Sequence, residues 1–281
     1  MNAVIVGAGG QLGRALRREF PDAVALDRGT LDVTDAAAVR GYDWSATDVV
    51  LNAAAWTAVD AAEDPANHAA VRAVNVGAVG HLVDAARAHG FALVHISSEY
   101  VFDGTHPGPI PENLEPTPLS VYGRSKADGD ALATALERHW VVRTTWLVGE
   151  GGNFVRTMAG LADRGISPSV VDDQFGRLTF ADDLAAGIRH LVETGAPYGT
   201  YNLTGDGEPA SWADVAAAVF VARGRSADDI TPVSTTDYFA GKTAIAPRPL
   251  NSVLALEKIR ANGFRPLEWR TALVAYLRSL G

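Results

Sequence analysis

The sequence predicts an α/β protein built on a doubly wound parallel sheet, with a smaller lobe in its C-terminal half. Short apolar runs alternate with helical patterns through about residue 150, as expected of parallel strands joined by helices. The first run leads directly into a glycine-rich turn and a helix. After about residue 150 the alternation loosens. We therefore expect a first domain over residues 1–150 and a partly interleaved lobe over residues 151–281, with some segments returning to the first domain.

Composition narrows the possible functions. The 281 residues are 47% hydrophobic and 20% charged, which is ordinary for a soluble globular protein. A formal net charge of −9 argues against nucleic acid as a partner. The absence of cysteine excludes disulfides and thiolate metal sites, and the seven histidines show no metal-ligand spacing. No apolar run reaches the roughly 18 residues of a membrane helix, and no basic region precedes the first strand, so we expect no membrane partner, no signal peptide and a cytoplasmic location.

The first predicted strand, residues 3–6, is continuous and apolar, and a helix is predicted over residues 12–20. The glycines between them are spaced Gly-x-x-Gly-x-x-Gly, which is typical of short-chain dehydrogenase/reductases. Glycines in a strand–turn–helix unit let the backbone approach a pyrophosphate, whose charge the helix N-terminus stabilises; the alternative is a plain glycine-rich turn. We predict a Rossmann-type domain whose cofactor-binding residues include Gly7, Gly10, Gln11, Leu12 and Gly13.

The second predicted strand, residues 23–26, ends at an acid and a base that favour different cofactors. Asp27 can accept hydrogen bonds from the adenosine ribose, which favours NAD. Arg28 can bind a 2′-phosphate, which favours NADP. The pair leaves the choice between NADPH and NADH open.

Further cofactor-binding candidates follow the second and third strands. Asp32 and Val33 are the first two, because an Asp at such a place contacts adenine in the short-chain superfamily; a solvated loop acid is the alternative reading of Asp32. Thr34 or Asp35 is expected to cap the next helix. A third strand over residues 48–51 leads to small side chains that let the backbone lie against a cofactor, namely Ala53, Ala54 and Ala55.

A long amphipathic helix is predicted over residues 66–89, and it contains Asn75. A buried Asn is costly unless its amide is hydrogen-bonded. Asn75 therefore either orders an active site, as an Asn does at this place in short-chain reductases, or serves only helix packing.

The chemistry is predicted at the carboxyl edge of the sheet, where ligands bind in open α/β folds. A fourth strand, residues 91–96, ends in hydroxyls at Ser97 and Ser98, about 24 residues before Tyr122. Lys126 follows Tyr122 by four positions, so the two side chains share a face if the segment is helical. The ammonium would then lower the pKa of the phenol and make it a useful proton donor near neutral pH. This spacing also recurs by chance on solvated helices, and it gains weight from the glycine turn and the strand-end serine.

The second half of the chain predicts one more strand and several helices. The strand, residues 140–146, is expected to reach the same edge of the sheet. Helical patterns joined by Gly/Pro-rich links cover residues 154–164, 181–193, 210–222, 253–261 and 269–280. These helices belong mainly to the smaller lobe.

Taken together, these segments resemble the dTDP-4-dehydrorhamnose reductase family of extended short-chain reductases, nearly from end to end. The glycine and Tyr/Lys motifs specify only the superfamily, whereas the Asn-Phe-Val, Asp-Asp-Gln and Arg-Pro-x-Asn-Ser segments are more specific. The matching segments are residues 7–13, 52–60, 96–104, 122–126, 143–146, 153–155, 171–176 and 246–254.

The resemblance implies NAD(P)H-dependent reduction of the C4 ketone of dTDP-4-dehydrorhamnose to dTDP-L-rhamnose. It implies a catalytic triad of Ser98, Tyr122 and Lys126, with Lys126 also binding the nicotinamide ribose. It further implies that the sugar pocket is lined by Thr57, Val59, Glu99, Tyr100 and Trp146. Because a nucleoside diphosphate needs an apolar slot and polar or cationic partners, the further substrate-binding candidates are Asn153, Gln174 and Arg248.

Three departures from the family pattern matter. The family usually has Ser-Thr-Asp-Tyr where this chain has Ser-Ser-Glu-Tyr at residues 97–100, which lengthens an acid pointed at the sugar. It usually has Gly-Ser-Pro-Thr where residues 176–179 are Gly-Arg-Leu-Thr. Some members bind Mg²⁺ between subunits through a glutamate at the position of Ala15. We therefore expect no metal and no metal-bridged dimer, and either a monomer or a homodimer.

Two other functions remain as alternatives. A 4-ketoreductase for another nucleotide-linked deoxysugar, in a natural-product pathway, is favoured by Glu99 and by Trp56, where tyrosine is commoner. A non-catalytic nucleotide-binding regulatory subunit could keep the fold, but the intact Ser98, Tyr122 and Lys126 argue against it. Dehydratases of this fold usually carry two adjacent acids, and the single acid after Ser98 counts against dehydration.

Overall fold

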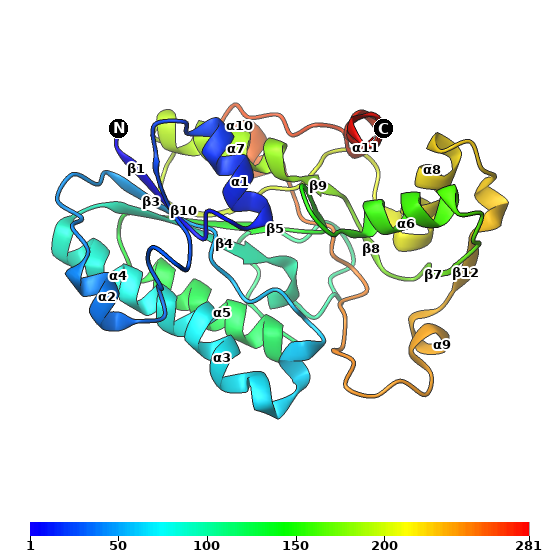
Figure 1. Cartoon of the computed structure of the whole chain (residues 1–281), viewed down its shortest axis with the longest axis horizontal. Coiled ribbons are helices and arrows are strands. Elements are labelled where there is room, and N and C mark those ends of the chain that lie inside the picture. Colours follow the sequence, from blue (N-terminus) through cyan, green and yellow to red (C-terminus); the bar gives the residue numbers. More distant parts are fainter. Residues whose placement is uncertain (281) are drawn as a thin grey trace.

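A six-stranded parallel sheet organises residues 1–280, which this computed structural model describes (Figure 1). Gly281, the last residue of the predicted lobe, lies outside the described residues. The strands lie in the order β10-β5-β4-β3-β1-β2, and every neighbouring pair is parallel. The predicted α/β fold class is confirmed by strands β1 (Ala3–Val6), β2 (Val24–Leu26), β3 (Val49–Asn52), β4 (Ala92–Ser98), β5 (His139–Thr144) and β10 (Gly199–Asn202).

Helices cover both faces of the sheet, which explains why its central strands are mainly apolar. Along β1, Ala3 and Ile5 pack into one core, whereas Val4 and Val6 pack into the other. One face is covered by α1 and α7, and the other by α4 and α5 with the shorter α2 (Figure 1). Their bounds are α1 (Gln11–Glu19), α2 (Ala36–Gly41), α4 (Ala78–His89), α5 (Val121–Thr134) and α7 (Ala181–Glu193).

The strand order reverses between β1 and β3. From β1 the chain moves to one side to form β2, and it then returns to build β3, β4, β5 and β10 on the other side. The loops after β1 and β3 therefore diverge at their carboxyl ends and leave a crevice there. Asp35, one of the two predicted caps, accepts hydrogen bonds from the backbone of Ala37 and Ala38 at the start of α2.

The smaller lobe has a hydrophobic core of its own, separate from the two cores on the faces of the sheet, and it lies beside the sheet (Figure 1). The lobe combines short strand pairs with helices. Its helices are α6 (Phe154–Asp163), α8 (Trp212–Ala222), α9 (Thr235–Phe239) and α11 (Trp269–Ser279), and its strand pairs are β6 (Leu147–Val148) with β9 (Thr179–Phe180), β7 (Ser169–Val171) with β12 (Thr231–Val233), and β8 (Phe175–Gly176) with β11 (Ala210–Ser211). Three elements after residue 150 pack with the first domain instead: β10, α7 and α10 (Glu257–Ala261).

The helix predicted over residues 66–89 is not regular. It begins with a 3₁₀ turn, η2 (Pro65–Asn67), and continues as α3 (His68–Arg72). A π-helical turn, η3 (Ala73–Gly77), then precedes α4. π-Turns often occur at functional sites because they re-aim one side chain. Here the turn contains Asn75, and periodicity alone could not reveal the extra residue.

Three other predicted boundaries are wrong. The strand over residues 140–146 stops at Thr144, because Trp146 adopts a positive φ of 42° and breaks the extended run. Residues 210–211 form a short strand, and Ser211 caps α8. The helix over residues 253–261 begins only at Glu257, because the backbone of Val253 and Ala255 is hydrogen-bonded to Ile110 instead.

The helices α5 and η3 approach each other closely at Gly129. A Cβ placed there would lie 2.5 Å from the carbonyl oxygen of Asn75, whereas one at the helical Gly160 of α6 would meet nothing within 4 Å. We expect Gly129→Ala to lower the free energy of unfolding by about 1–3 kcal/mol through overpacking. The matched variant Gly160→Ala should raise it by about 0.5–1 kcal/mol. Urea unfolding measures both values, and equal effects of the two variants would contradict the close approach.

Candidate active site

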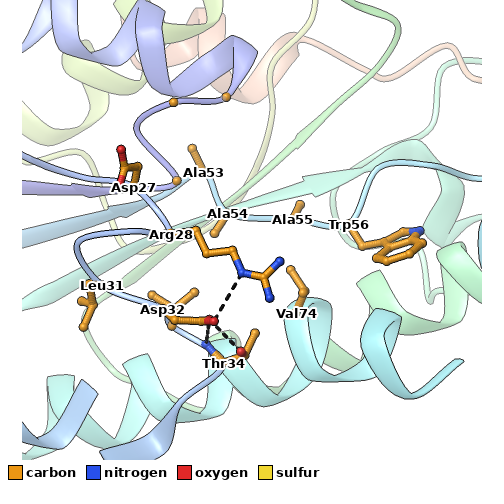
Figure 2. A pocket seen from close by; sticks show the side chains of 14 residues that line it. Asp27, Arg28, Leu31, Asp32, Thr34, Ala53, Ala54, Ala55, Trp56 and Val74 are labelled. Carbon is orange, nitrogen blue, oxygen red and sulfur yellow. Dashed lines mark hydrogen bonds and ion pairs between the residues drawn. The ribbon is translucent and has the colours of Figure 1, made fainter. Parts of the chain in front are cut away.

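A cavity of about 450 Å³ lies in the crevice where the strand order reverses (Figure 2). It is bounded by the turn after β1, the end of β2 and the segment after β3. Among the predicted cofactor-binding residues, Gly7, Gly10, Asp27, Arg28, Asp32, Val33, Ala53, Ala54 and Ala55 line it. Gln11 and Leu12 lie in the first turn of α1 and Gly13 lies beneath the turn, so these three do not line it.

The glycine turn is shaped so that no side chain could replace its key glycines. Gly7 has a φ of 75°, and a Cβ there would lie 2.5 Å from the backbone nitrogen of Ala54. A Cβ on Gly13 would lie 2.2 Å from the Gly7 carbonyl. Gly10 is the N-cap of α1, and because it has no side chain, no side-chain hydrogen bond caps this end of the helix. The exposed start of α1 suits the pyrophosphate of a dinucleotide.

The acid and base after β2 point to different parts of the cavity (Figure 2). Asp27 Oδ1 accepts hydrogen bonds from the backbone of Gly29 at 2.9 Å and Thr30 at 3.0 Å, and these bonds lower its pKa. The guanidinium of Arg28 extends across the cavity to Asp32 at 3.3 Å, and the Arg28 side chain is 86% exposed. Thr34 donates to Asp32 from its backbone nitrogen and its hydroxyl, which holds that acid in place and lowers its pKa.

At the end of β4, Ser98 and Glu99 form a buried hydrogen-bonded pair. The Ser98 hydroxyl donates to Glu99 Oε2 at 2.6 Å and accepts from the backbone nitrogen of Tyr100 at 3.3 Å. Both side chains lie at the start of the 3₁₀ turn η4 (Glu99–Val101). Burial raises the pKa of Glu99 to about 7, against the hydrogen bond from Ser98 that lowers it.

Tyr122 and Lys126 both lie on α5 and are both buried, with 8% and 2% of their surfaces exposed. The Tyr122 ring packs edge-on against Tyr100, with centroids 5.4 Å apart. α5 reaches this position because a Cβ on Gly123 would lie 2.2 Å from the Tyr100 carbonyl, so only glycine fits. The helix thus brings the phenol next to the strand-end serine, and the Ser98 side chain lowers the pKa of Tyr122.

The expected effect of Lys126 on Tyr122 is wrong for this arrangement. Burial raises the pKa of Tyr122 well above its ordinary value, the negative charge of Glu99 raises it further, and the Ser98 side chain opposes both. The Lys126 ammonium instead donates to the carbonyl oxygen of Ile96 at 2.6 Å. Burial lowers the pKa of Lys126 to about 8, which Asp130 partly offsets.

A buried ionic cluster lies beneath Lys126, and the sequence analysis missed it. Asp130 Oδ2 lies 3.2 Å from Arg143 Nε, and Asp130 Oδ1 lies 3.6 Å from His95 Nε2. Burial lowers the pKa of His95, and the charge of Lys126 lowers it further, so this imidazole is neutral. Asp130 follows Lys126 by four positions on α5, and that spacing was the available signal.

Asn75 is buried and hydrogen-bonded on both sides of its amide. Its Oδ1 accepts from the backbone nitrogen of Trp56 at 2.8 Å, and its Nδ2 donates to the Trp56 carbonyl at 3.2 Å and to Ser125 Oγ at 2.9 Å. It therefore joins α5 to the segment after β3. Trp56, Val59, Tyr100 and Tyr122 pack in one cluster, whereas Thr57 is exposed.

A second cavity, of about 320 Å³, lies in the smaller lobe. Gln174 and Arg248 line it, but Asn153 and Trp146 do not. Asn153 caps α6 and donates to Gly149 and Tyr276, and Trp146 stacks on Trp212 with centroids 3.7 Å apart. Aromatic side chains that the sequence analysis did not single out form much of the wall, namely Phe154, Trp212, Tyr238 and Phe239.

Arg248 connects this second cavity to the first domain. Its Nη2 lies 2.8 Å from Asp60 Oδ2, and its guanidinium lies 4.7 Å from the centre of the Phe239 ring. The charges of Arg248 and Asp60 also act on the pKa of Tyr100, the neighbour of Tyr122. Tyr122 therefore packs in one cluster with Trp56, which lines the crevice, and with Tyr100, on which the charge of Arg248 in the lobe cavity acts.

These features define a class of protein. A glycine turn at the sheet's reversal point, with a strand-end serine and a Tyr/Lys pair beside it, is the arrangement of a short-chain dehydrogenase/reductase. The model of the family described as RmlD substrate binding domain matches residues 1–281. The chain belongs to this family, that of the dTDP-4-dehydrorhamnose reductases.

Individual relatives match along the whole chain. It is 39% identical to a dTDP-4-dehydrorhamnose reductase of Aggregatibacter actinomycetemcomitans, over 96% of each protein. It is 37% identical to a dTDP-4-keto-6-deoxy-D-glucose reductase of Streptomyces niveus, over 96% of this chain and 94% of that protein. The crystal structure of a dTDP-4-dehydrorhamnose reductase from Bacillus anthracis in complex with NADP superimposes with a TM-score of 0.90 at 31% identity, covering 100% of this chain and 99% of the other.

Residues 1–280 contain neither a metal cluster nor a membrane-spanning helix. No group of three or more His, Asp or Glu side chains in this range could hold a metal ion. The position of the family's metal-binding glutamate is occupied by Ala15, which is fully buried beneath α7. No helix in the described range is long and apolar enough to cross a membrane.

The bonds of Asn75 yield a prediction about stability. Asn75→Ala removes three hydrogen bonds and leaves the backbone N–H and C=O of Trp56 without these partners, whereas Ser125 Oγ keeps its bond to the Tyr122 carbonyl, so we expect a loss of about 2–4 kcal/mol in the free energy of unfolding. The control is Asn67→Ala, which removes one exposed bond to Ala61 and should cost less than about 1 kcal/mol. Chemical unfolding followed by tryptophan fluorescence measures both, and similar losses would contradict the assigned role of Asn75.

Proposed function

We propose that this protein reduces the C4 ketone of dTDP-4-dehydrorhamnose to dTDP-L-rhamnose, with NADPH or NADH as the reductant. The observation that carries the proposal is the packing of Tyr122 against Trp56, which lines the dinucleotide-shaped crevice, and against Tyr100, whose pKa responds to Arg248 of the aromatic cavity. The activities named for the family members that match end to end support the same reaction.

The crevice suits a nicotinamide dinucleotide. A Cβ at Gly7 or Gly13 would collide with backbone atoms, so only glycine fits at these positions. A turn without side chains lets the backbone approach a pyrophosphate closely. We assign the turn and the start of α1 to the pyrophosphate, Asp27 and Arg28 to the adenosine ribose, and Lys126 to the nicotinamide ribose. When bound, the cofactor supplies the hydride that is added to C4 of the sugar.

Three side chains would carry the rest of the reaction. Tyr122 donates its proton to the sugar oxygen as negative charge develops there. Ser98 donates a hydrogen bond to the same oxygen and orients the ketone. Lys126, with its ammonium anchored on the Ile96 carbonyl, would hold the nicotinamide ribose beside Tyr122 rather than lower the pKa of the phenol.

We assign the second cavity to the nucleoside diphosphate. Phe154, Tyr238 and Phe239 offer faces on which a base can stack, and Arg248 and Gln174 offer donors to the phosphates. Thr57, Val59, Glu99, Tyr100 and Trp146 remain our candidates for the sugar itself, and Asn153 for the neighbourhood of the nucleotide. The domain division at residue 150, a cytoplasmic location and a monomeric or homodimeric state without a bridging metal stay predictions.

A second candidate function is reduction of a different deoxysugar. Glu99 favours it, because a buried acid with a raised pKa at the sugar site differs from the shorter acid usual in the family. The named activity of the Streptomyces niveus relative supports it as well. Purified protein should be given dTDP-4-keto-6-deoxyglucose with and without a 3,5-epimerase, and the product identified. Turnover only without the epimerase would favour the second function, and no turnover of any keto-sugar would favour a non-catalytic role.

Tyr122 gives the central test of the mechanism. Tyr122→Phe should lower kcat by about 10²–10⁴, the usual contribution of a general acid. NADPH binding should change little, because the ring and its packing on Tyr100 are kept. Steady-state turnover and fluorescence titration with NADPH measure the two effects. Near-normal turnover in this variant would sink the mechanism.

Arg28 gives a test of cofactor choice. If its guanidinium binds a 2′-phosphate, Arg28→Ala should weaken NADPH binding by about tenfold to a hundredfold, the range for a charged hydrogen bond. Affinity for NADH should be unchanged, since NADH lacks that phosphate. Arg40→Ala, at an exposed arginine of α2 outside the cavity, is the control. Equal losses for the two cofactors would show that Arg28 does not discriminate between them.

A further inference from the structure

The hydrogen-bonded pair of Ser98 and Glu99 has few hydrogens that it can donate. A serine hydroxyl carries a single donor hydrogen and two acceptor positions. Ser98 uses that hydrogen on Glu99 Oε2 at 2.6 Å, and the backbone nitrogen of Tyr100 occupies an acceptor position. Ser98 and Glu99 are 7% and 3% exposed, so water does not compete freely for either group.

The proposed reaction needs the same hydrogen. To stabilise the developing oxyanion at C4, Ser98 must donate to the sugar oxygen. An ionised Glu99 is only an acceptor, and it holds the Ser98 hydrogen. A neutral Glu99 has a hydrogen of its own, so it can donate to Ser98 Oγ and release the serine hydrogen toward the sugar. The two protonation states of Glu99 therefore leave Ser98 pointing in different directions.

We propose that Glu99 is a positioning residue that sets the direction of the Ser98 hydroxyl, releasing it for the sugar ketone when neutral and withholding it when ionised. The inference rests on the proposed ketone reduction and adds a residue to it. It differs from a sugar-binding role for Glu99, because the acid acts through Ser98 rather than on the substrate.

The surroundings of Glu99 place this switch near neutral pH. The backbone nitrogens of Glu99 and Tyr100 and the hydroxyl of Ser98 lower the pKa of its carboxyl, whereas burial raises it to about 7. Tyr122 faces it from α5, where Lys126 and Asp130 follow, and Asp60 and Arg248 act on the adjacent Tyr100. Glu99 is thus neutral below about pH 7 and ionised above it, so turnover should fall as the pH rises.

The acid Tyr122 responds in the same direction. The negative charge of Glu99 raises the pKa of Tyr122, which makes the phenol a weaker proton donor. Neutral Glu99 removes that charge. Protonation of Glu99 therefore has two effects: it releases the Ser98 hydroxyl, and it makes Tyr122 a stronger proton donor. Both effects favour reduction at a pH below the pKa of Glu99.

The first experiment compares pH profiles of kcat, measured with 4-deuterated NADPH so that hydride transfer limits the rate. The wild-type protein should lose about tenfold per pH unit above pH 7, as expected of one ionisation. Glu99→Gln should be flat from pH 6 to about pH 7.5, because its amide does not titrate and Lys126, with a pKa of about 8, is still mostly charged there. Glu193→Gln, at an exposed glutamate of α7, is the control and should keep the wild-type profile.

Ser98→Ala tests whether Glu99 acts through the serine. In that background Glu99→Gln should change the pH profile little further, because the hydroxyl it would orient is gone. A purely sugar-binding Glu99 would instead raise KM in both backgrounds and leave the slope of kcat unchanged. That outcome would overturn the proposal while leaving ketone reduction intact.

A second measurement is independent of turnover and separates this proposal from the proposed function. In protein labelled with [5-¹³C]glutamate, one carboxyl resonance should titrate near pH 7 and be missing from Glu99→Gln. In Ser98→Ala it should titrate at higher pH, because the hydrogen bond that lowers its pKa is lost. A Glu99 resonance ionised throughout, from pH 5 upward, refutes the switch even if the ketone is reduced. The titration as expected, without any turnover, would refute the function instead.

Discussion

The hydrogen bond from the buried Lys126 ammonium to the Ile96 carbonyl is the interaction on which the active site depends. It fastens the middle of α5 to the end of β4, and the glycines at positions 123 and 129 let the helix come close enough to make it. An ammonium with 2% exposure is costly to bury unless it is bonded and has a partner charge. Because the bond exists, Tyr122 lies beside the strand-end serine in a fixed place.

The cluster beneath Lys126 explains how the site tolerates this burial. One oxygen of Asp130 lies 3.2 Å from Arg143 and the other lies 3.6 Å from His95, and the charge of Asp130 also favours the Lys126 ammonium. The imidazole stays neutral because burial and Lys126 both lower its pKa. Removing one partner would leave an uncompensated buried charge, which usually costs more than the pair contributes. The cluster therefore fixes the geometry of the site more than it adds to overall stability.

The site lies where the sheet domain and the smaller lobe meet. The reversal of strand order creates a crevice for a dinucleotide, and the lobe supplies an aromatic cavity with Arg248 at its edge. The ion pair of Arg248 with Asp60 joins them across the site. Membership of the dTDP-4-dehydrorhamnose reductase family fits this division of labour. Ser98 and Glu99 are buried together as a hydrogen-bonded pair at the end of β4.

Features that depend on local spacing could be predicted from the sequence. The strand, glycine turn and helix near Gly7, and the four-residue interval from Tyr122 to Lys126, follow from backbone periodicity and are as predicted. Features that depend on burial and on residues distant in the sequence became visible in the tertiary structure. The π-turn at Asn75 and the pairing of residues 253–255 with Ile110 override helical periodicity. The pKa of Tyr122 rises, rather than falls, because Glu99 and a closed apolar environment surround a phenol whose lysine is bonded elsewhere.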